Sequence, residues 1–346
     1  MPRLGLAVPI DGLGFTESLE LALEAERLGY TDAWAYEVNG SDGFTPLAWL
    51  AARSTTLRLG ISLVPVFTRP PALLAMSSAS LHHLSGGRFV LGLGSSSPNV
   101  VDRWMGGEHS RPLTRVRETV EAVRLALSGD KAAYRGTTLR MDDFRLGLPG
   151  AQVPIQLGAL GPRMYRQAGA IGDGVITVFN TAAATPALLE DFYAGAAEAG
   201  RDPSTLDVVS KLFVAVDEDL DDLRPMLQRF LTGYGTVPAY NALLRRQGFA
   251  AEASAMADAW ADGRRADAMA AVTDELLRAL IVCGSAAECA EQLGGFVEAG
   301  VRTLLVAPIT AATGDERRAR LEHTIEAVAR MIDTVAVDTG ETPELY

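Results

Sequence analysis

Short apolar segments alternate with amphipathic, helix-like segments along almost the whole chain. Eight of the apolar segments have the length of a strand, and nearly all of them are followed by a helical pattern. They read as buried on both faces, which is typical of parallel strands that are covered on both sides. We expect the strands at residues 4–8, 32–36, 57–64, 88–93, 154–157, 174–178, 207–216 and 303–307. This order predicts an α/β protein with a (β/α)₈ TIM barrel.

A doubly wound sheet is the alternative to a barrel. It would use fewer strands, and its first strand typically leads into a glycine-rich phosphate loop. Here the first strand is followed by Ile-Asp-Gly-Leu-Gly-Phe at residues 10–15, which is not that fingerprint. We therefore expect one barrel over residues 1–335, with insertions at about 95–150 and 233–280, where the alternation breaks, and a polar tail over 336–346.

Composition excludes several classes of function. The net charge of −12 would repel phosphate backbones and anionic lipids, so we expect neither nucleic-acid nor membrane partners. Only two basic residues are lysines, Lys131 and Lys211, and nothing in their neighbouring sequence marks either for Schiff-base chemistry. Two cysteines imply no disulfide framework, and no cluster has metal-ligand spacing. Without a secretory signal or a bilayer-length apolar run, we expect a cytoplasmic protein that binds no metal.

Functional residues of a (β/α)₈ barrel lie after the C-terminal ends of its strands. Glu37 follows the second expected strand, and Ser62 is a small polar residue within the third, where a planar ligand could approach. A solvated loop carboxylate and a simple strand serine are the alternative interpretations. After the fourth strand, Gly92 and Gly94 permit close approach of a flat ring or of a backbone, and the hydroxyls of residues 95–97 can bond polar ring edges or a polyol chain.

The fifth expected strand leads into Gly158-Ala-Leu-Gly-Pro-Arg163. Pro162 suits the first position of a helix, so the peptide N–H groups here would face an anion, with Arg163 in the first turn. This pattern predicts a phosphate site; an ordinary helix start is the alternative.

Several of these stretches occur together and in order, and they resemble the bacterial luciferase-like superfamily. Within it the chain is most similar to the branch of deazaflavin (coenzyme F420)-dependent oxidoreductases. The resemblance covers essentially the whole chain. The stretches that carry it are residues 25–34, 58–70, 84–94, 158–163, 237–241 and 283–300.

The resemblance implies a barrel, usually dimeric, with a ring-binding cleft at the C-terminal ends of the strands. It also implies a non-prolyl cis peptide bond behind the ring, here Ser62–Leu63, and makes Glu37 and Asn39 the polar groups nearest the reacting carbon and the catalytic candidates. The residues it assigns to the cofactor are Glu37, Ser62, Leu63, Gly92, Gly94, Ser95, Ser96, Ser97, Gly158, Ala159, Leu160, Gly161 and Arg163.

The activity implied is hydride transfer between coenzyme F420 and a small organic substrate. Sugar-phosphate dehydrogenases of this branch carry a histidine next to the acidic residue and a glutamate after strand four. Val38 and Ser97 stand at those positions here, so the resemblance does not extend to that activity, and it identifies no general acid or base.

Two other functions fit the same superfamily. One is an FMN-dependent monooxygenase that works with a flavin reductase, and the other is a non-catalytic barrel. The glycine loops favour a ligand-binding barrel over a structural one. We expect a homodimer that acts on a small molecule and receives its reduced cofactor from a separate enzyme.

Overall fold

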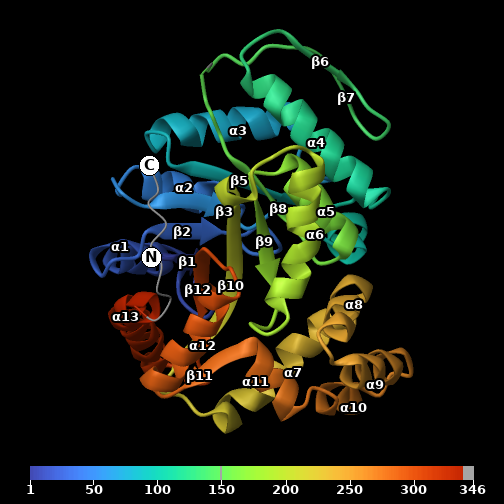
Figure 1. Ribbon diagram of the computed structural model, residues 1–346. Helices are drawn as coiled ribbons and strands as arrows, with labels where there is room; N and C mark the ends of the chain where they lie inside the picture. Colours follow the sequence, from blue (N-terminus) through green and yellow to red (C-terminus); the bar gives the residue numbers. More distant parts are fainter. Residues whose placement is uncertain (149, 338–346) are drawn as a thin grey trace.

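The barrel predicted from the alternation is present. The computed structural model describes residues 1–148 and 150–337, with side chains up to Ile332. In this part of the chain, eight parallel strands close into a barrel, because β10 bonds to both β9 and β12 (Figure 1). They are β1 (Arg3–Val8), β2 (Asp32–Ala35), β3 (Arg58–Ile61), β5 (Phe89–Gly94), β8 (Ile155–Gly158), β9 (Gly174–Val178), β10 (Asp207–Val216) and β12 (Thr303–Pro308). Each predicted strand overlaps one of these, so the fold prediction is confirmed.

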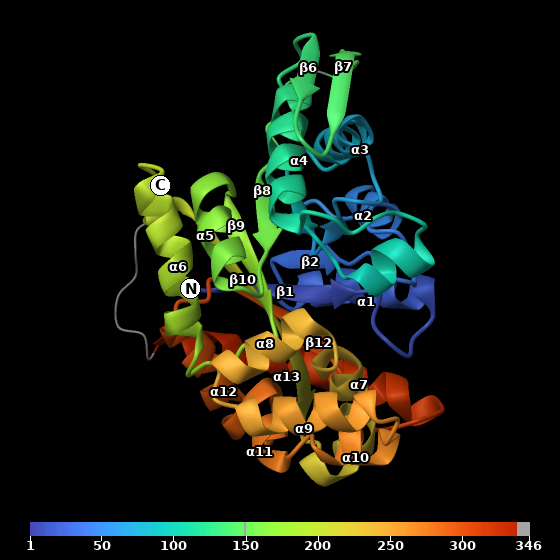
Figure 2. The same cartoon turned by 90° about the vertical axis from the view of Figure 1, so that its right-hand side faces the viewer.

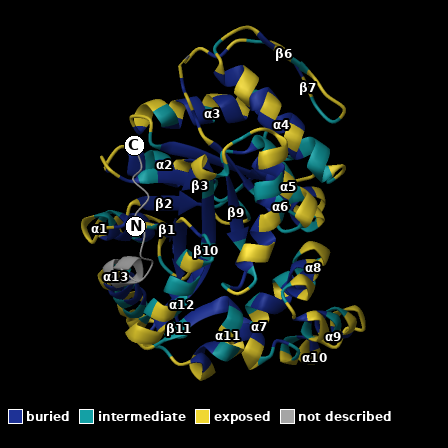
Figure 3. Cartoon of the chain, viewed as in Figure 1, coloured by how far each residue is buried: buried dark blue, intermediate teal, exposed yellow. Residues whose placement is uncertain are grey.

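Helices cover the outside of the barrel. Their inner faces are buried and their outer faces exposed (Figure 3). They are α1 (Phe15–Arg27), α2 (Thr45–Ala51), α3 (Pro71–Leu84), α4 (Pro112–Leu127), α5 (Pro162–Ile171), α6 (Thr185–Glu198), α7 (Leu220–Gly235), α12 (Ala286–Glu298) and α13 (Asp315–Val337), with a 3₁₀ turn η2 (Pro203–Thr205). None of the described helices is long and apolar enough to cross a bilayer. Most of the predicted tail, residues 338–346, lies outside the described residues.

A buried ion-pair network fills the N-terminal end of the barrel. Arg58 on β3 donates from Nε to Asp32 on β2, and its Nη1 lies 2.7 Å from Oδ2 of Asp207 on β10. Its Nη2 donates to Thr303 Oγ1 on β12 at 2.9 Å. Because these strands lie around the circumference, the guanidinium crosses the interior and joins them. The indole of Trp34 completes this layer by donating to Asp32 at 3.2 Å.

Trp34 also fills the middle of the barrel, and one glycine makes room for it. A Cβ atom at Gly60 would lie 2.2 Å from Trp34 Cε3, far inside van der Waals contact. The interior is therefore packed from the N-terminal end up to Trp34, as in other barrels of this type. Only the C-terminal end is left for a ligand.

Two insertions project from opposite ends of the molecule in Figure 2. The first holds a π-helical turn η1 (Asn99–Trp104) and an antiparallel hairpin of β6 (Ala132–Arg135) and β7 (Arg140–Phe144). The sequence predicted only that the alternation of strands and helices breaks here, so this hairpin was not expected. The second holds α8 (Pro238–Arg246), α9 (Ala250–Ala261), α10 (Arg265–Ala270) and α11 (Asp274–Leu280). Two further short strands, β4 (Val64–Pro65) and β11 (Ile281–Gly284), pair with β5 and β10.

The hairpin is anchored to α4 by one buried carboxylate. Glu118 accepts from the backbone N–H groups of Thr137 and Thr138 at 2.6 and 2.7 Å, and from Thr138 Oγ1 at 2.7 Å. Burial opposes ionisation of Glu118, but these hydrogen bonds outweigh it and lower its pKa to about 2. A Cβ at Gly136 would lie 2.4 Å from Glu118 Oε2, so the turn requires glycine there.

Candidate active site

The C-terminal strand ends bring most of the predicted cofactor residues together. β4 pairs with β5 so that Pro65 lies opposite Gly94, and β5 pairs with β8 so that Leu93 lies opposite Leu157. The predicted cis peptide bond, Ser62–Leu63, is present between β3 and β4. Ser62, Gly94 and Gly158 therefore occupy neighbouring strand ends on one side of the barrel mouth.

The glycines at these strand ends accommodate protein atoms. A Cβ at Gly92 would lie 1.8 Å from the backbone oxygen of Ile61. Cβ atoms at Gly94 and Gly158 would lie 2.5 and 2.2 Å from Leu63 Cδ2. Of the two neighbours expected beside Gly92 and Gly94, a flat ring or a backbone, the structure shows protein, because the β3–β4 segment occupies this space. Leu63, packed on both glycines, forms a partly exposed apolar shelf at the mouth.

Glu37 is engaged in an ion pair. Arg69 Nε lies 3.0 Å from Glu37 Oε1, and Arg69 Nη2 lies 2.8 Å from Oε2. The N–H of Gly43 also donates to Oε2 at 2.9 Å. Hydrogen bonding to Glu37 raises the pKa of Arg69. Glu37 therefore ties the β2–α2 loop to the segment before α3. Asn39, the other catalytic candidate, is exposed in the same loop.

The start of α5 has the features of an anion site. Gly161 precedes the helix in an extended conformation, no side chain caps the N-terminus, and a Cβ at Gly161 would meet nothing within 4 Å. Arg163 is exposed in the first turn, and the Arg246 guanidinium of α8 donates to the backbone oxygen of Leu160. Free N–H groups, open space and two cations together suit a phosphate. Ala159, by contrast, is buried.

The serine loop, residues 95–97, connects β5 to the first insertion. Ser96 adopts a left-handed conformation with φ of 57°, which turns the chain directly after β5. Ser97 Oγ accepts from the N–H of Val100 at 3.4 Å, at the start of η1. Ser95, Ser96 and Ser97 remain partly exposed toward solvent.

The opposite side of the mouth is aromatic, and the sequence argument missed it. Phe179 follows β9 and stacks on Phe213 of β10, with ring centroids 5.3 Å apart. Phe230 and Tyr234 of α7 lie 5.8 and 4.9 Å from Phe179, and Tyr240 of α8 lies 5.8 Å away. The five rings form what we call the aromatic cluster. Its members are too far apart in sequence to be recognised before β9, β10, α7 and α8 are placed.

The second insertion is fixed over this side by hydrogen bonds. Gln247, just after α8, donates from Nε2 to the backbone oxygen of Phe179 at 2.8 Å. Its Oε1 accepts from the N–H of Thr181 at 2.7 Å. Beside the cluster, a hollow of about 230 Å³ opens between Asp11, Phe213, Phe230 and Pro308.

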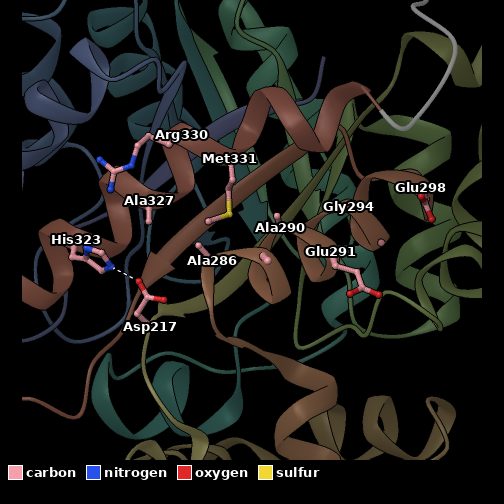
Figure 4. A pocket seen from close by; sticks show the side chains of 12 residues that line it. Asp217, Ala286, Ala290, Glu291, Gly294, Glu298, His323, Ala327, Arg330 and Met331 are labelled. Carbon is pink, nitrogen blue, oxygen red and sulfur yellow. Dashed lines mark hydrogen bonds and ion pairs between the residues drawn. The ribbon is translucent and has the colours of Figure 1, made fainter.

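A larger hollow, of about 870 Å³, lies in the outer layer between α12 and α13 (Figure 4). It is lined by the small residues Ala286, Ala290 and Gly294, and at one end His323 Nε2 lies 2.8 Å from Asp217 Oδ2. It contains none of the predicted site residues. No group of three or more potential metal ligands exists among the described residues.

The comparisons with known proteins agree with this geometry. The profile of a family described as luciferase-like monooxygenase matches residues 5–303. The chain belongs to this family. Among its relatives, the 5,10-methylenetetrahydromethanopterin reductase of Methanolobus tindarius is 29% identical over 300 residues, which cover 86% of this chain and 91% of that protein.

Two further members of the luciferase-like family are informative. The F420-dependent glucose-6-phosphate dehydrogenase of Nocardia farcinica is 30% identical over 239 residues, 63% of this chain and 70% of that protein. The solved structure of the coenzyme F420-dependent tetrahydromethanopterin reductase of Methanopyrus kandleri superposes with a TM-score of 0.80 at 23% identity, covering 96% of this chain and 99% of that one. The whole barrel, insertions included, therefore has the luciferase-like fold.

Proposed function

We propose that this protein is an oxidoreductase that uses coenzyme F420 to transfer a hydride to or from a small organic substrate. The observation that carries the proposal is the two-sided mouth of the barrel. One side offers the Leu63 shelf beside an open, uncapped helix start, and the other offers the aromatic cluster. Two of the three relatives above are named for coenzyme F420, which supports this cofactor over FMN.

The residues present fit such a cofactor. The N-terminus of α5, with Arg163 in its first turn, would hold a phosphate, and Leu63 would pack against a flat ring. The partly exposed serines of the serine loop, directly after β5, would bond a polyol chain. When bound, a deazaflavin supplies two-electron hydride chemistry. The chain's own contribution is to orient the ring and to keep water from its reacting face.

We propose that Glu37 positions other residues of the site and that Asn39 contacts the substrate. The Glu37 carboxylate already accepts three hydrogen bonds, so it fixes the loop that carries Asn39 and the segment that carries Arg69. Asn39 is exposed in that loop and would supply a polar group to the substrate. Glucose 6-phosphate is not proposed as the substrate, because Val38 and Ser97 replace the residues that the sugar-phosphate branch carries.

We also propose that the protein acts in the cytoplasm as a homodimer, with its cofactor reduced by a separate enzyme. The basis for the dimer is the chain's membership of the luciferase-like family, which implies a barrel that is usually dimeric. Sedimentation equilibrium tests the dimer directly.

The experiment that tests the cofactor is a titration of the purified protein with coenzyme F420 and, separately, with FMN, followed by ligand fluorescence. We expect micromolar binding of F420 and much weaker binding of FMN. Arg163→Met should weaken F420 binding about tenfold through the lost charge on the phosphate. The control is Arg166→Met on the same helix, where the arginine is exposed and pairs with Asp191 and Glu198.

Two outcomes would contradict the proposal. A preference for FMN would place the protein among the monooxygenases that need a flavin reductase. Binding of neither ligand would favour a non-catalytic barrel. Equal losses in Arg163→Met and Arg166→Met would remove the start of α5 from the phosphate site while leaving the choice of cofactor to the titration of the unaltered protein.

A further inference from the structure

Lys211 projects into the interior of the barrel at its C-terminal end. It lies on β10, opposite Val178 of β9 and Leu305 of β12. Its Nζ atom nevertheless lies 4.3 Å from the centroid of the Tyr36 ring, which follows β2. Since β12 and β1 separate β10 from β2, the side chain must reach across the lumen. The neighbouring Ser210 points the other way, donating to Asn180 Oδ1 at 2.9 Å.

Within the described part of the chain, no carboxylate forms an ion pair with the ammonium group. None of the ion pairs or hydrogen bonds formed by described side chains involves Lys211, whereas the only other lysine, Lys131, lies 2.8 Å from Asp143. The charge of Asp11 acts on Lys211 without an ion pair, and Asp11 Oδ1 instead accepts a hydrogen bond from the Tyr36 hydroxyl at 2.8 Å. Removing a cation from water without a counter-ion in contact costs free energy of folding. An apolar side chain at this position would avoid that cost.

The surroundings of Nζ show what could compensate that charge. Two aromatic rings lie beside Nζ. One is the Tyr36 ring, and the other is the Phe213 ring of the aromatic cluster, whose centroid is 5.6 Å from Nζ. Rings stabilise a cation only partly, far less than a carboxylate in contact would. Lys211 is not fully buried, and Asp11 and Phe213 line the hollow of about 230 Å³ beside it. The charge is thus accessible from the mouth, next to an apolar space.

We propose that Lys211 binds the oxygen atom of the substrate, and that the substrate is an apolar, ring-sized molecule with one carbonyl or carboxylate group. The apolar body would lie against the aromatic cluster and the oxygen would accept a hydrogen bond from Nζ. The inference rests on the proposed function, because it names the substrate class of that same site. An ammonium at this place stabilises an oxygen on which negative charge is present or develops.

The charge state of Lys211 makes the contact dependent on pH. Burial lowers the pKa of Lys211 to about 8, and the charge of Asp11 partly offsets this. The other titratable groups that face this region are Tyr36 after β2, Tyr234 on α7 and Arg317 on α13, which lines the same hollow and donates to the backbone oxygen of Ala312. Burial raises the pKa of both tyrosines, so both stay neutral. Affinity for an anion should therefore be highest below pH 8 and fall as the pH rises above it.

The probe is cinnamate, with neutral cinnamyl alcohol as the uncharged match, titrated into the protein by calorimetry at pH 7 and pH 9.5. We expect Lys211→Met to weaken cinnamate binding at least about tenfold at pH 7 and to leave cinnamyl alcohol binding unchanged. Lys211→Arg should retain cinnamate binding at both pH values, because arginine stays charged. Lys131→Met, which removes the only other lysine, is the matched control and should bind as the unaltered protein does.

Three results would overturn the proposal: no binding of cinnamate to the unaltered protein, equal affinity in Lys211→Met, or an affinity that does not change between pH 7 and pH 9.5. Circular dichroism of each variant checks that the barrel is folded. Coenzyme F420 binding is measured on the same samples. If cinnamate binds as expected but F420 does not bind, only the proposed cofactor is contradicted. If F420 binds but cinnamate does not, only the role of Lys211 is contradicted.

Discussion

Substituting alanine at two nearby glycines separates packing from ligand access at the barrel mouth. Gly158 ends β8, and a Cβ there would lie 2.2 Å from Leu63 Cδ2, whereas ordinary contact begins near 3.4 Å. Gly161, three residues later, faces open space and has φ of −116°, which alanine adopts without strain. The two substitutions add the same methyl group to the same loop. Their different surroundings should give different outcomes.

The magnitude follows from how far Leu63 must move. In Gly158→Ala its Cδ2 must retreat by about 1 Å, into a segment that also packs on Gly94. Overpacking of this kind costs about 1–3 kcal/mol, and alanine recovers up to about 1 kcal/mol by restricting the unfolded chain. We expect Gly158→Ala to lose about 1–2 kcal/mol of unfolding free energy. The unfolding free energy of Gly161→Ala should stay within about 0.5 kcal/mol of that of the unaltered protein. Alanine is the poorer N-cap residue, but it also restricts the unfolded chain, and these two effects nearly cancel.

Urea unfolding followed by circular dichroism measures both values, and the F420 titration adds a second readout. Gly158→Ala displaces the Leu63 shelf and Gly161→Ala fills the space at the helix start, so both should weaken F420 binding. Only the first should also lower stability. The reasoning is refuted if Gly158→Ala is as stable as the unaltered protein, or if Gly161→Ala is the less stable of the two.

Other predictions concern the charged groups. Arg58→Met leaves the buried Asp32 without its partner and should cost about 3–5 kcal/mol in urea unfolding; a loss below about 1 kcal/mol would contradict the interior network. Because the pKa of Glu118 is lowered, its contribution to the free energy of unfolding is complete above pH 4.5 and is lost as the pH falls toward about 2. Glu118→Gln should therefore flatten the acid limb of a stability–pH profile, and an unchanged limb would count against it. Glu37→Gln breaks the ion pair with Arg69 and should lower turnover more than thermal stability; unaltered kinetics would remove Glu37 from the site.

The barrel could be predicted because its signal is local. Each strand is a short apolar run, and helix ends such as Gly29 and Gly300, both with positive φ, mark where the chain turns back into the barrel. The hairpin of β6 and β7 was missed because its residues, Ala132–Arg135 and Arg140–Phe144, are charged and mostly exposed, so they lack an apolar alternation. The carboxylate that anchors it lies on a separate helix.

The chemistry of the mouth was less predictable because it depends on contacts between distant segments. Arg69 follows Glu37 by 32 residues, and only the fold shows that the two form a pair. Lys211 has an unremarkable sequence context. The groups that act on its Nζ are Asp11 after β1, Tyr36 after β2 and Phe213 on β10, and only the fold brings the first two to it. Gly92 was correctly placed at a strand end, but its physical role, clearance for the Ile61 oxygen, needed coordinates.

A crystal structure of the protein with coenzyme F420 tests the central claim most directly. The account predicts that the phosphate lies at the N-terminus of α5, that the ring packs against Leu63, and that Lys211 stays open on the aromatic side. Cofactor density anywhere else, for example in the hollow between α12 and α13, would contradict it.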